Sequence, residues 1–286
     1  GSGVALGDVD GDGWCDIYLC RLEGTNVLYR NLGDWRFEDI TSSAGVACSG
    51  QFSTGTALAD VDGDGDLDLL VNSFGGGTRL FLNDGAAQFT EVQNSGLASR
   101  FGSTSMALAD IDADGDLELY VSNYRTTTVK DGVPGLKAEA KLVNGKIVVT
   151  PEDRFVAVMP KSGGVRVSEI GEPDIVYVNK GRGRFGPISW TGGAFVDEDA
   201  KPLTGPPRDW GLSAMFRDLN GDGTPDLYVC NDFFYSPDRA WLNEAGQRFR
   251  AIPRLAFRKM SMSSMAVDFA DVNRDGFDDI FVADML

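Results

Sequence analysis

The chain has 286 residues, a formal net charge of −17 and no histidine. The acidity argues against nucleic acid as a partner, because phosphate binding needs a basic face. The lack of histidine excludes a Ser-His-Asp or Cys-His nucleophile and any histidine-ligated metal site.

No apolar run is long enough to cross a membrane, so we expect no transmembrane segment. No signal peptide is recognised. Residues 1–6 already read as a strand inside a repeat, so a targeting segment would have to lie upstream of this sequence.

In chain order, the most regular feature is an acidic nine-residue segment that recurs without gaps. It covers residues 8–16, 60–68, 110–118, 218–226 and 271–279. The starting positions lie 52, 50, 108 and 53 residues apart, so the period is about 50 residues, once extended by an insertion.

Each period predicts four short strands. In the second repeat these are a small apolar run at 55–59, an apolar run at 67–71 after the acidic segment, a strand ending at Asn83, and one starting at Phe89. Four strands in such a repeat are typical of a β-propeller blade. The fold class is therefore all-β, a propeller of four-stranded blades; the alternative is a β-sandwich with coincidental repeats.

Two segments interrupt the repeat. Residues 126–172 form an insertion in the third blade with room for a hairpin of its own, and residues 190–209 are rich in Gly and Pro and predict a loop. We assign residues 1–286 to one partial propeller domain that carries this insertion.

The acidic segments have the chemistry of a calcium loop. Oxygen ligands at positions 1, 3, 5 and 9, a backbone carbonyl at position 7 and a Gly at position 6 form a cage that suits Ca²⁺. The alternative is a set of simple Asp-Gly turns. The predicted metal-binding residues are Asp8, Asp10, Asp12, Trp14 and Asp16; Asp60, Asp62, Asp64, Asp66 and Asp68; Asp110, Asp112, Asp114, Asp116 and Glu118; Asp218, Asn220, Asp222, Thr224 and Asp226; and Asp271, Asn273, Asp275, Phe277 and Asp279.

The loops are not EF-hands. An EF-hand has a Glu at position 12 between two helices. Here position 12 is Leu or Val, as in Leu19 and Val71, and the flanks are strand-like.

At these residues the chain resembles the FG-GAP/VCBS repeat proteins, which include the integrin α-chain propellers. Within this class, the sequence segments 209–218, 227–233 and 265–271 most resemble the cartilage-acidic-protein-like group of bacteria. The resemblance implies a secreted, periplasmic or cell-surface protein with a seven-bladed propeller, of which this chain accounts for about five blades. Glu118, Asn220, Asn273 and Arg274 depart from the loop pattern.

The leading functional prediction is an extracytoplasmic calcium-binding propeller that acts as a binding, adhesion or scaffolding module and is not an enzyme. One alternative is a propeller enzyme acting on polysaccharide, for which Asp232, Asp238 and Arg239 are the candidate catalytic residues. Another is a structural subunit of a larger extracytoplasmic complex.

Alternating strand directions place the 126–172 insertion and the 231–235 loop on the face opposite the calcium loops. Long loops on rigid scaffolds often carry binding sites, and the insertion is locally basic. The basic residues are Arg125, Lys130, Lys137, Lys141, Lys146, Arg154, Lys161 and Arg166. We therefore expect a protein or anionic glycan partner on this face; the alternative is an insertion that only covers the rim.

The chain has four cysteines, Cys15, Cys20, Cys48 and Cys230. Cys20 and Cys48 are both predicted on the face opposite the acidic loops, and an extracellular setting would allow a disulfide between them. The alternative is two free thiols that pack as small apolar groups.

Overall fold

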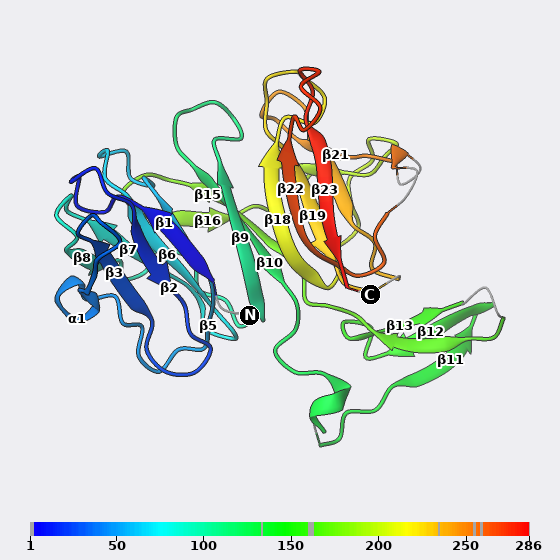
Figure 1. Ribbon diagram of the computed structural model, residues 1–286. Helices are drawn as coiled ribbons and strands as arrows, with labels where there is room; N and C mark the ends of the chain where they lie inside the picture. The colour runs from blue at the N-terminus through cyan, green and yellow to red at the C-terminus, as the bar shows by residue number, and fades with distance from the viewer. Residues whose placement is uncertain are drawn as a thin grey trace.

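The structure is a computed structural model that describes residues 3–132, 134–159, 163–233, 235–253, 256–257 and 260–285. It is nearly all-β and built from repeated four-stranded antiparallel sheets, which confirms the predicted propeller class. Figure 1 shows the strands, and its only labelled helix is α1 (Thr41–Ala44). Within these residues no helix is long and apolar enough to span a membrane.

The first three sheets have the same strand arrangement. The first holds β1 (Val4–Gly7), β2 (Asp16–Leu19), β3 (Val27–Asn31) and β4 (Phe37–Asp39). The second holds β5 (Ser53–Ala59), β6 (Asp68–Ser73), β7 (Gly77–Asn83) and β8 (Phe89–Glu91). The third holds β9 (Ser103–Ala109), β10 (Glu118–Asn123), β15 (Ile175–Asn179) and β16 (Phe185–Pro187).

The last two sheets depart from this arrangement. The fourth holds β18 (Gly211–Arg217), β19 (Asp226–Asn231), β20 (Arg239–Asn243), β21 (Phe249–Ala251) and an added β17 (Phe195–Val196). In the fifth, the described residues give β22 (Ser264–Ala270) and β23 (Asp279–Asp284). The β17 strand pairs parallel to β21.

The prediction of a loop over 190–209 is therefore wrong at residues 195–196. Phe195 is fully buried and stacks on Phe249 at 5.2 Å between ring centroids, while Trp190 lies 4.2 Å from Phe195. Because burying large aromatic surface is strongly stabilising, these two side chains hold a Gly- and Pro-rich segment against the blade.

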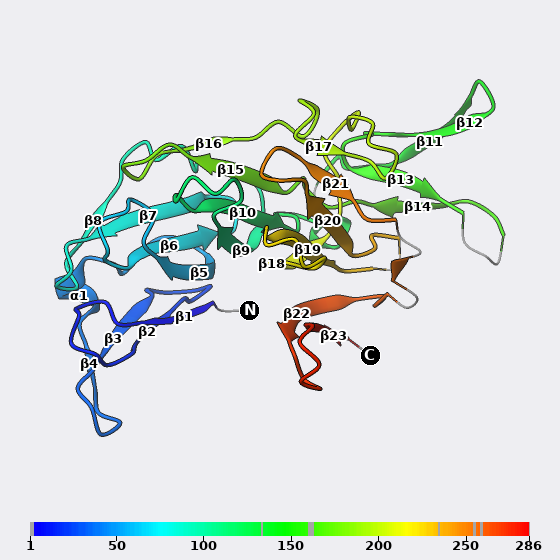
Figure 2. The same cartoon turned by 90° about the horizontal axis from the view of Figure 1, so that it is seen from above.

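The blades follow one another around a common centre, as Figure 2 shows from above. The inner strands β1, β5, β9, β18 and β22 contact each other in that order. The second strands of the second, third and fourth blades are covered on both faces, which explains why all six residues of β6, β10 and β19 are buried. Separate apolar clusters fill the spaces between successive blades.

The insertion forms two hairpins rather than the one allowed for by the sequence. They are β11 (Glu139–Val143) with β12 (Lys146–Thr150), and β13 (Phe155–Val158) with β14 (Arg166–Glu169). A 3-10 helix, η1 (Val129–Asp131), precedes them. In Figure 1 the acidic loops lie at the top of the blades and the hairpins project from the opposite end.

All four cysteines are free thiols, so the Cys20–Cys48 disulfide is not formed in this structure. Both are buried in the same apolar cluster. The Cys48 thiol lies 3.6 Å from the Tyr18 hydroxyl, and the Cys20 thiol donates to the Gly55 carbonyl at 3.6 Å. Packing as small apolar groups, the alternative interpretation, is what the structure shows.

Candidate metal centre

Each acidic loop is folded by its own first Asp. In the second loop, the two carboxylate oxygens of Asp60 accept hydrogen bonds from the backbone N–H groups of Gly63 (2.8 Å) and Gly65 (2.9 Å). Both glycines have positive φ, 82° and 96°, a conformation that side chains with a Cβ disfavour. The loop geometry thus follows from local sequence, and the same bonds recur at Asp8 and Asp218.

The acid at position 9 is buried under the loop in four of the five repeats. Asp68 has no exposed surface and accepts hydrogen bonds from the N–H groups of Val61 (3.0 Å) and Asn83 (2.9 Å). Its counterparts, also fully buried, are Asp16, Glu118 and Asp226. Asp279 of the fifth loop is exposed and accepts from Val272 at 3.2 Å.

Burial and neighbouring carboxylates disfavour the charged form of these acids. Burial, with a further contribution from Asp62 and Asp64, raises the pKa of Asp68 to about 6. The same causes, with Asp112 and Asp114 as neighbours, raise the pKa of Glu118 to about 7. A bound cation would favour the ionised carboxylates and offset their repulsion.

Carboxylates from positions 1, 3 and 9 converge in three of the loops. Within each set, one ligand oxygen per residue lies within 4.8 Å of the others. The sets are Asp8, Asp10 and Asp16; Asp60, Asp62 and Asp68; and Asp110, Asp112 and Glu118. An all-oxygen set of this size could hold a metal ion and suits a hard cation such as Ca²⁺.

The remaining predicted ligands have other partners. At position 5, Asp64 accepts a hydrogen bond from the N–H of Asp66 at 3.0 Å, and Asp12 does the same for Trp14 at 2.9 Å. In the fourth and fifth loops, position 3 is an Asn, so the acids there do not form a three-carboxylate set among the described residues. The large side chain of Phe277 at position 7 is 77% exposed, which suits a residue that would offer only its carbonyl.

Sequence reasoning did not find the Asn that ends each third strand as part of this site. Asn83 donates its side-chain N–H to the Val9 carbonyl of the preceding loop at 2.9 Å, and Asn179 does so to Val61 at 2.9 Å. Asn243 repeats the contact with Ile111 at 2.7 Å. The recurrence of this Asn was the available signal; its role in tying one loop to the next blade was visible only in the structure.

In the first loop, a positively charged side chain pairs with two of the predicted metal ligands. The Arg30 Nε lies 2.5 Å from an oxygen of Asp10, and an Arg30 terminal nitrogen lies 3.3 Å from Asp12. The aligned residues of the next two blades are Leu82 and Val178, which carry no charge.

The residues considered for catalysis are engaged in structural contacts. Asp238 is buried and accepts hydrogen bonds from the Tyr228 hydroxyl (2.8 Å) and the Ser264 hydroxyl (2.6 Å). Arg239 forms an ion pair with Asp209.

Asp232 is likewise bonded to its surroundings. It accepts from the Tyr124 hydroxyl at 3.0 Å and from the Phe233 N–H at 2.8 Å. All three candidate catalytic residues thus make structural contacts, and two of them, Asp238 and Arg239, also line a small pocket of about 80 Å³.

Four-stranded blades with an acidic loop between the first two strands define a β-propeller repeat protein. The model of the FG-GAP-like repeat matches residues 8–71, 60–121 and 218–282. The chain therefore belongs to the FG-GAP-like repeat family, as the resemblance of its acidic loops predicted.

Cartilage acidic protein 1 is similar to part of the chain. The protein of Xenopus tropicalis is 37% identical over 95 residues, and that of Homo sapiens 35% identical over the same length. Each alignment covers 32% of this chain and 15% or 14% of the relative, respectively. The match thus spans about a seventh of the length of these relatives.

Two solved structures are similar over most of the chain at low identity. The V. cholerae biofilm matrix protein Bap1 is 12% identical with a TM-score of 0.39, covering 97% of this chain and 65% of that one. BBS1N, solved in complex with ARL6DN, is 15% identical with a TM-score of 0.34, covering 90% and 67%.

Proposed function

We propose that this chain is an extracytoplasmic Ca²⁺-binding propeller that acts as a binding, adhesion or scaffolding module without catalytic activity of its own. The observation that carries the proposal is the convergence of carboxylates from positions 1, 3 and 9 in three successive loops. Each set places one buried carboxylate beside two others that repel it, which is costly without a cation, and the oxygen chemistry of the set fits Ca²⁺. The similarity to a cartilage protein supports an extracellular setting.

The five predicted ions would act as structural cofactors. An ion that binds only the folded state stabilises it by mass action. Removing Ca²⁺ with a chelator should therefore lower the melting temperature by several degrees, and restoring Ca²⁺ should reverse the change. An unchanged melting temperature, with no ions found by elemental analysis of the purified protein, would contradict the proposal.

A matched pair of variants separates a ligand from a nearby charge. Asp62→Asn alters position 3 of the second loop, whereas Asp66→Asn alters position 7, where only the carbonyl is needed. Both remove one negative charge. Calcium titration should show a weakened site for Asp62→Asn and a normal one for Asp66→Asn; equal weakening would indicate a general charge effect instead.

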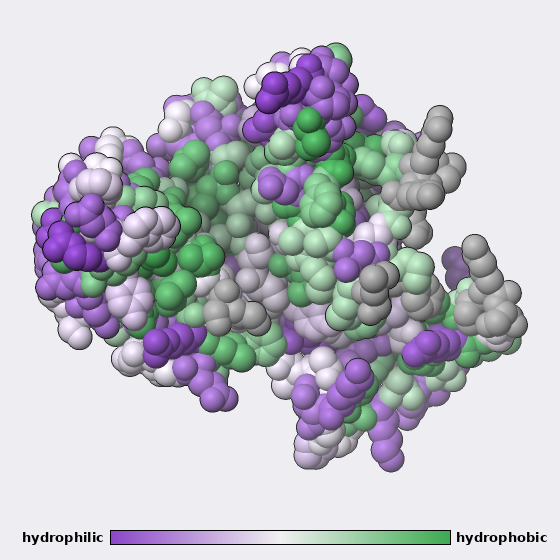
Figure 3. All heavy atoms as spheres, viewed as in Figure 1, coloured by the Kyte–Doolittle hydropathy of each residue, from purple (hydrophilic) through white to green (hydrophobic). Residues whose placement is uncertain are grey.

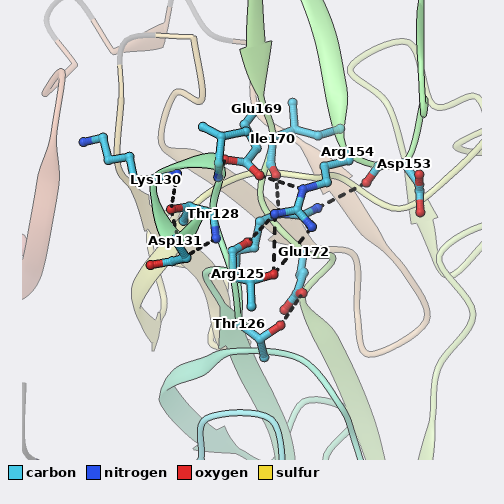
Figure 4. Close-up of polar contacts among 12 residues, drawn as sticks. Arg125, Thr126, Thr128, Lys130, Asp131, Asp153, Arg154, Glu169, Ile170 and Glu172 are labelled. Carbon is cyan, nitrogen blue, oxygen red and sulfur yellow. Dashed lines mark hydrogen bonds and ion pairs between the residues drawn. The ribbon is translucent and has the colours of Figure 1, made fainter. Parts of the chain in front are cut away.

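The partner surface is proposed at the end opposite the acidic loops, on the insertion of residues 126–172. The part of the insertion that joins it to the third blade, which we call its stem, is held by hydrogen bonds and ion pairs, as Figure 4 shows. Arg125 is buried and donates to the carbonyls of Ile170 (2.8 Å) and Asp153 (3.2 Å), while Glu172 accepts from the N–H of Gly102 at 2.7 Å. A rigid projection is suited to binding because little order must be gained on contact.

The predicted basic character of the insertion is reduced by these contacts. Arg125 and Arg154 are used inside the stem, and Lys141 pairs with Glu139 at 3.1 Å. Lys161 lies outside the described residues. A deletion of residues 126–172, bridged by a short Gly-Ser turn, tests the surface: if the shortened protein keeps its Ca²⁺ and every partner of the parent, this surface is not the binding site.

A further inference from the structure

A pocket of about 400 Å³ lies where the insertion meets the fourth blade. One side comes from the 3-10 helix η1 and from β14, and the other from the residue before β18 and the loop between β19 and β20. Residues more than a hundred positions apart thus share one cavity, which is separate from the metal loops and borders the stem at Glu169.

The floor and one wall of the pocket are aromatic. Trp210 is buried, with Tyr124 at 4.6 Å and Phe233 at 5.3 Å between ring centroids. Tyr235 stacks on Phe233 at 5.6 Å with an angle of 2° between the rings. Tyr124, Phe233 and Tyr235 are partly exposed, so flat ring surface borders the cavity.

The polar ends of these rings are tied to the protein. The Trp210 Nε1 donates to the Glu169 carbonyl at 3.2 Å, and the Tyr124 hydroxyl donates to Asp232. The ring faces, rather than the polar edges, are therefore what Trp210 and Tyr124 can offer to a ligand. The negative face of an aromatic ring attracts C–H groups that carry partial positive charge.

The mouth of the pocket carries positive charge. Lys130 and Arg166 both line it and are exposed, and neither has a carboxylate partner among the residues that the structure describes. The lining carboxylate, Glu169, is engaged by Arg154 Nε at 2.7 Å and by the Val129 N–H at 3.0 Å. Figure 4 shows Glu169 turned toward Arg154 in this way. Two unpaired cations on a chain of net charge −17 favour an anionic ligand.

We propose that this pocket binds one ring of an acidic saccharide, a sugar that bears a carboxylate or a sulfate. The inference rests on the proposed function as a binding module and names its ligand class. The apolar C–H face of the sugar would stack on the aromatic wall, while the anionic group would meet Lys130 and Arg166. A pocket with aromatic walls and few polar groups that fix orientation is typical of small-ligand sites. An acidic peptide would satisfy the cations but leave the flat rings without a matching face.

The test uses the full chain saturated with Ca²⁺ and isothermal titration with defined probes. The probes are a hyaluronate hexasaccharide, which carries carboxylates, a carrageenan hexasaccharide, which carries sulfates, the neutral hexa-N-acetylchitohexaose, and a hexaglutamate peptide. We expect at least one anionic saccharide to bind, with an affinity that falls with added salt and exceeds that for the neutral saccharide by at least about tenfold. Which of the two binds distinguishes carboxylate from sulfate.

Three variants locate the binding. Lys130→Gln with Arg166→Gln should weaken it at least about tenfold, whereas the control pair Lys137→Gln with Lys146→Gln, an equal charge change on the same insertion, should change it by less than about twofold. Phe233→Leu keeps an apolar side chain but removes the ring, and should also weaken binding.

The inference is overturned if neither anionic saccharide binds, if both double variants bind equally, if Phe233→Leu binds as the parent does, or if only hexaglutamate binds. Each variant is first checked for an unchanged melting temperature in Ca²⁺. Because the titration reports the pocket and the calcium-dependent melting shift reports the loops, the two proposals fail separately.

Discussion

The first and third blades place the same strands in the same register, yet their side chains differ at many aligned positions, and three of these bear on the polar contacts of the blade. The pairs, first blade before third, are Asp16 and Glu118, Asn26 and Asp174, and Arg30 and Val178. The comparison shows which features of the blade depend on a hydrogen-bonding role and which depend on a particular side chain.

At position 9 of the acidic loop, the residue differs between the two blades but accepts the same two backbone hydrogen bonds. Asp16 accepts from the N–H groups of Val9 and Asn31 at 2.9 and 2.8 Å. Glu118 accepts from the corresponding groups at 3.1 and 3.3 Å. The extra methylene of Glu118 is accommodated with longer hydrogen bonds.

At the start of the third strand the direction of a hydrogen bond is reversed. Asn26 donates to the Tyr18 hydroxyl at 2.9 Å, whereas Asp174 accepts from the Tyr120 hydroxyl at 2.5 Å. Both also accept a backbone N–H, that of Arg21 or of its counterpart in the third blade. The same tyrosine contact is thus made by a neutral amide in one blade and by an acid in the other.

The largest effect is expected at position 9. Glu118→Ala or Asp16→Ala would leave two backbone N–H groups without acceptors, at a cost of about 2–4 kcal/mol. Urea unfolding in the presence of a chelator measures this cost apart from metal binding. Asp112→Asn, an exposed loop acid, serves as the control and should change stability little under the same conditions. A loss below about 1 kcal/mol at both buried positions would mean that water or a neighbouring group replaces the carboxylate.

The second effect concerns pH. Burial raises the pKa of Asp174 to about 7 from its ordinary value of 3.8, so the folded protein holds this proton more tightly than the unfolded chain. The contribution of protonated Asp174 to the free energy of unfolding is fully present below about pH 4 and is lost as the pH rises through 7. Asp174→Asn should remove this part of the pH dependence, about 3 kcal/mol between pH 4 and 7.

The reverse change in the first blade sharpens the result. Asn26→Asp should introduce a loss of stability with rising pH that the parent first blade lacks. Chemical unfolding of the two variants and the parent across this range gives the difference curves. Parallel curves for Asp174→Asn and the parent would show that this acid is ionised throughout.

The smallest effect is expected beside the metal loops. The ion pair between Arg30 and Asp10 must break before Asp10 can bind an ion. Arg30→Leu should therefore tighten calcium binding at the first loop about three- to fivefold. This factor corresponds to the roughly 1 kcal/mol expected for a partly exposed ion pair. Val178→Arg should weaken the third loop by a similar factor. Calcium titrations of both variants provide the measurement, and an unchanged first loop would mean that Arg30 does not compete with the ion.

The loops and strands were predictable because each depends on residues close in sequence. A Gly at position 6 and an Asp at position 1 fold the loop within five residues, and alternation with a terminal Asn marks the strands. The placement of the 126–172 insertion at the end opposite the acidic loops was predictable from the alternating strand directions alone. The convergence of positions 1, 3 and 9 agrees with the predicted cage, and position 5, the other predicted side-chain ligand, accepts a hydrogen bond from the loop backbone.

The sequence by itself determined the repeat, the propeller class and the acid-rich loops, since a period and a turn are set by local spacing. Only the tertiary structure decided the contacts between distant segments: Asn83 on the Val9 carbonyl, Phe195 packed on Phe249, and the aromatic pocket over Trp210. It also gave Cys20 and Cys48 as separate thiols. These contacts depend on which surfaces meet when the blades stack, and local spacing does not specify which side chains will face each other there.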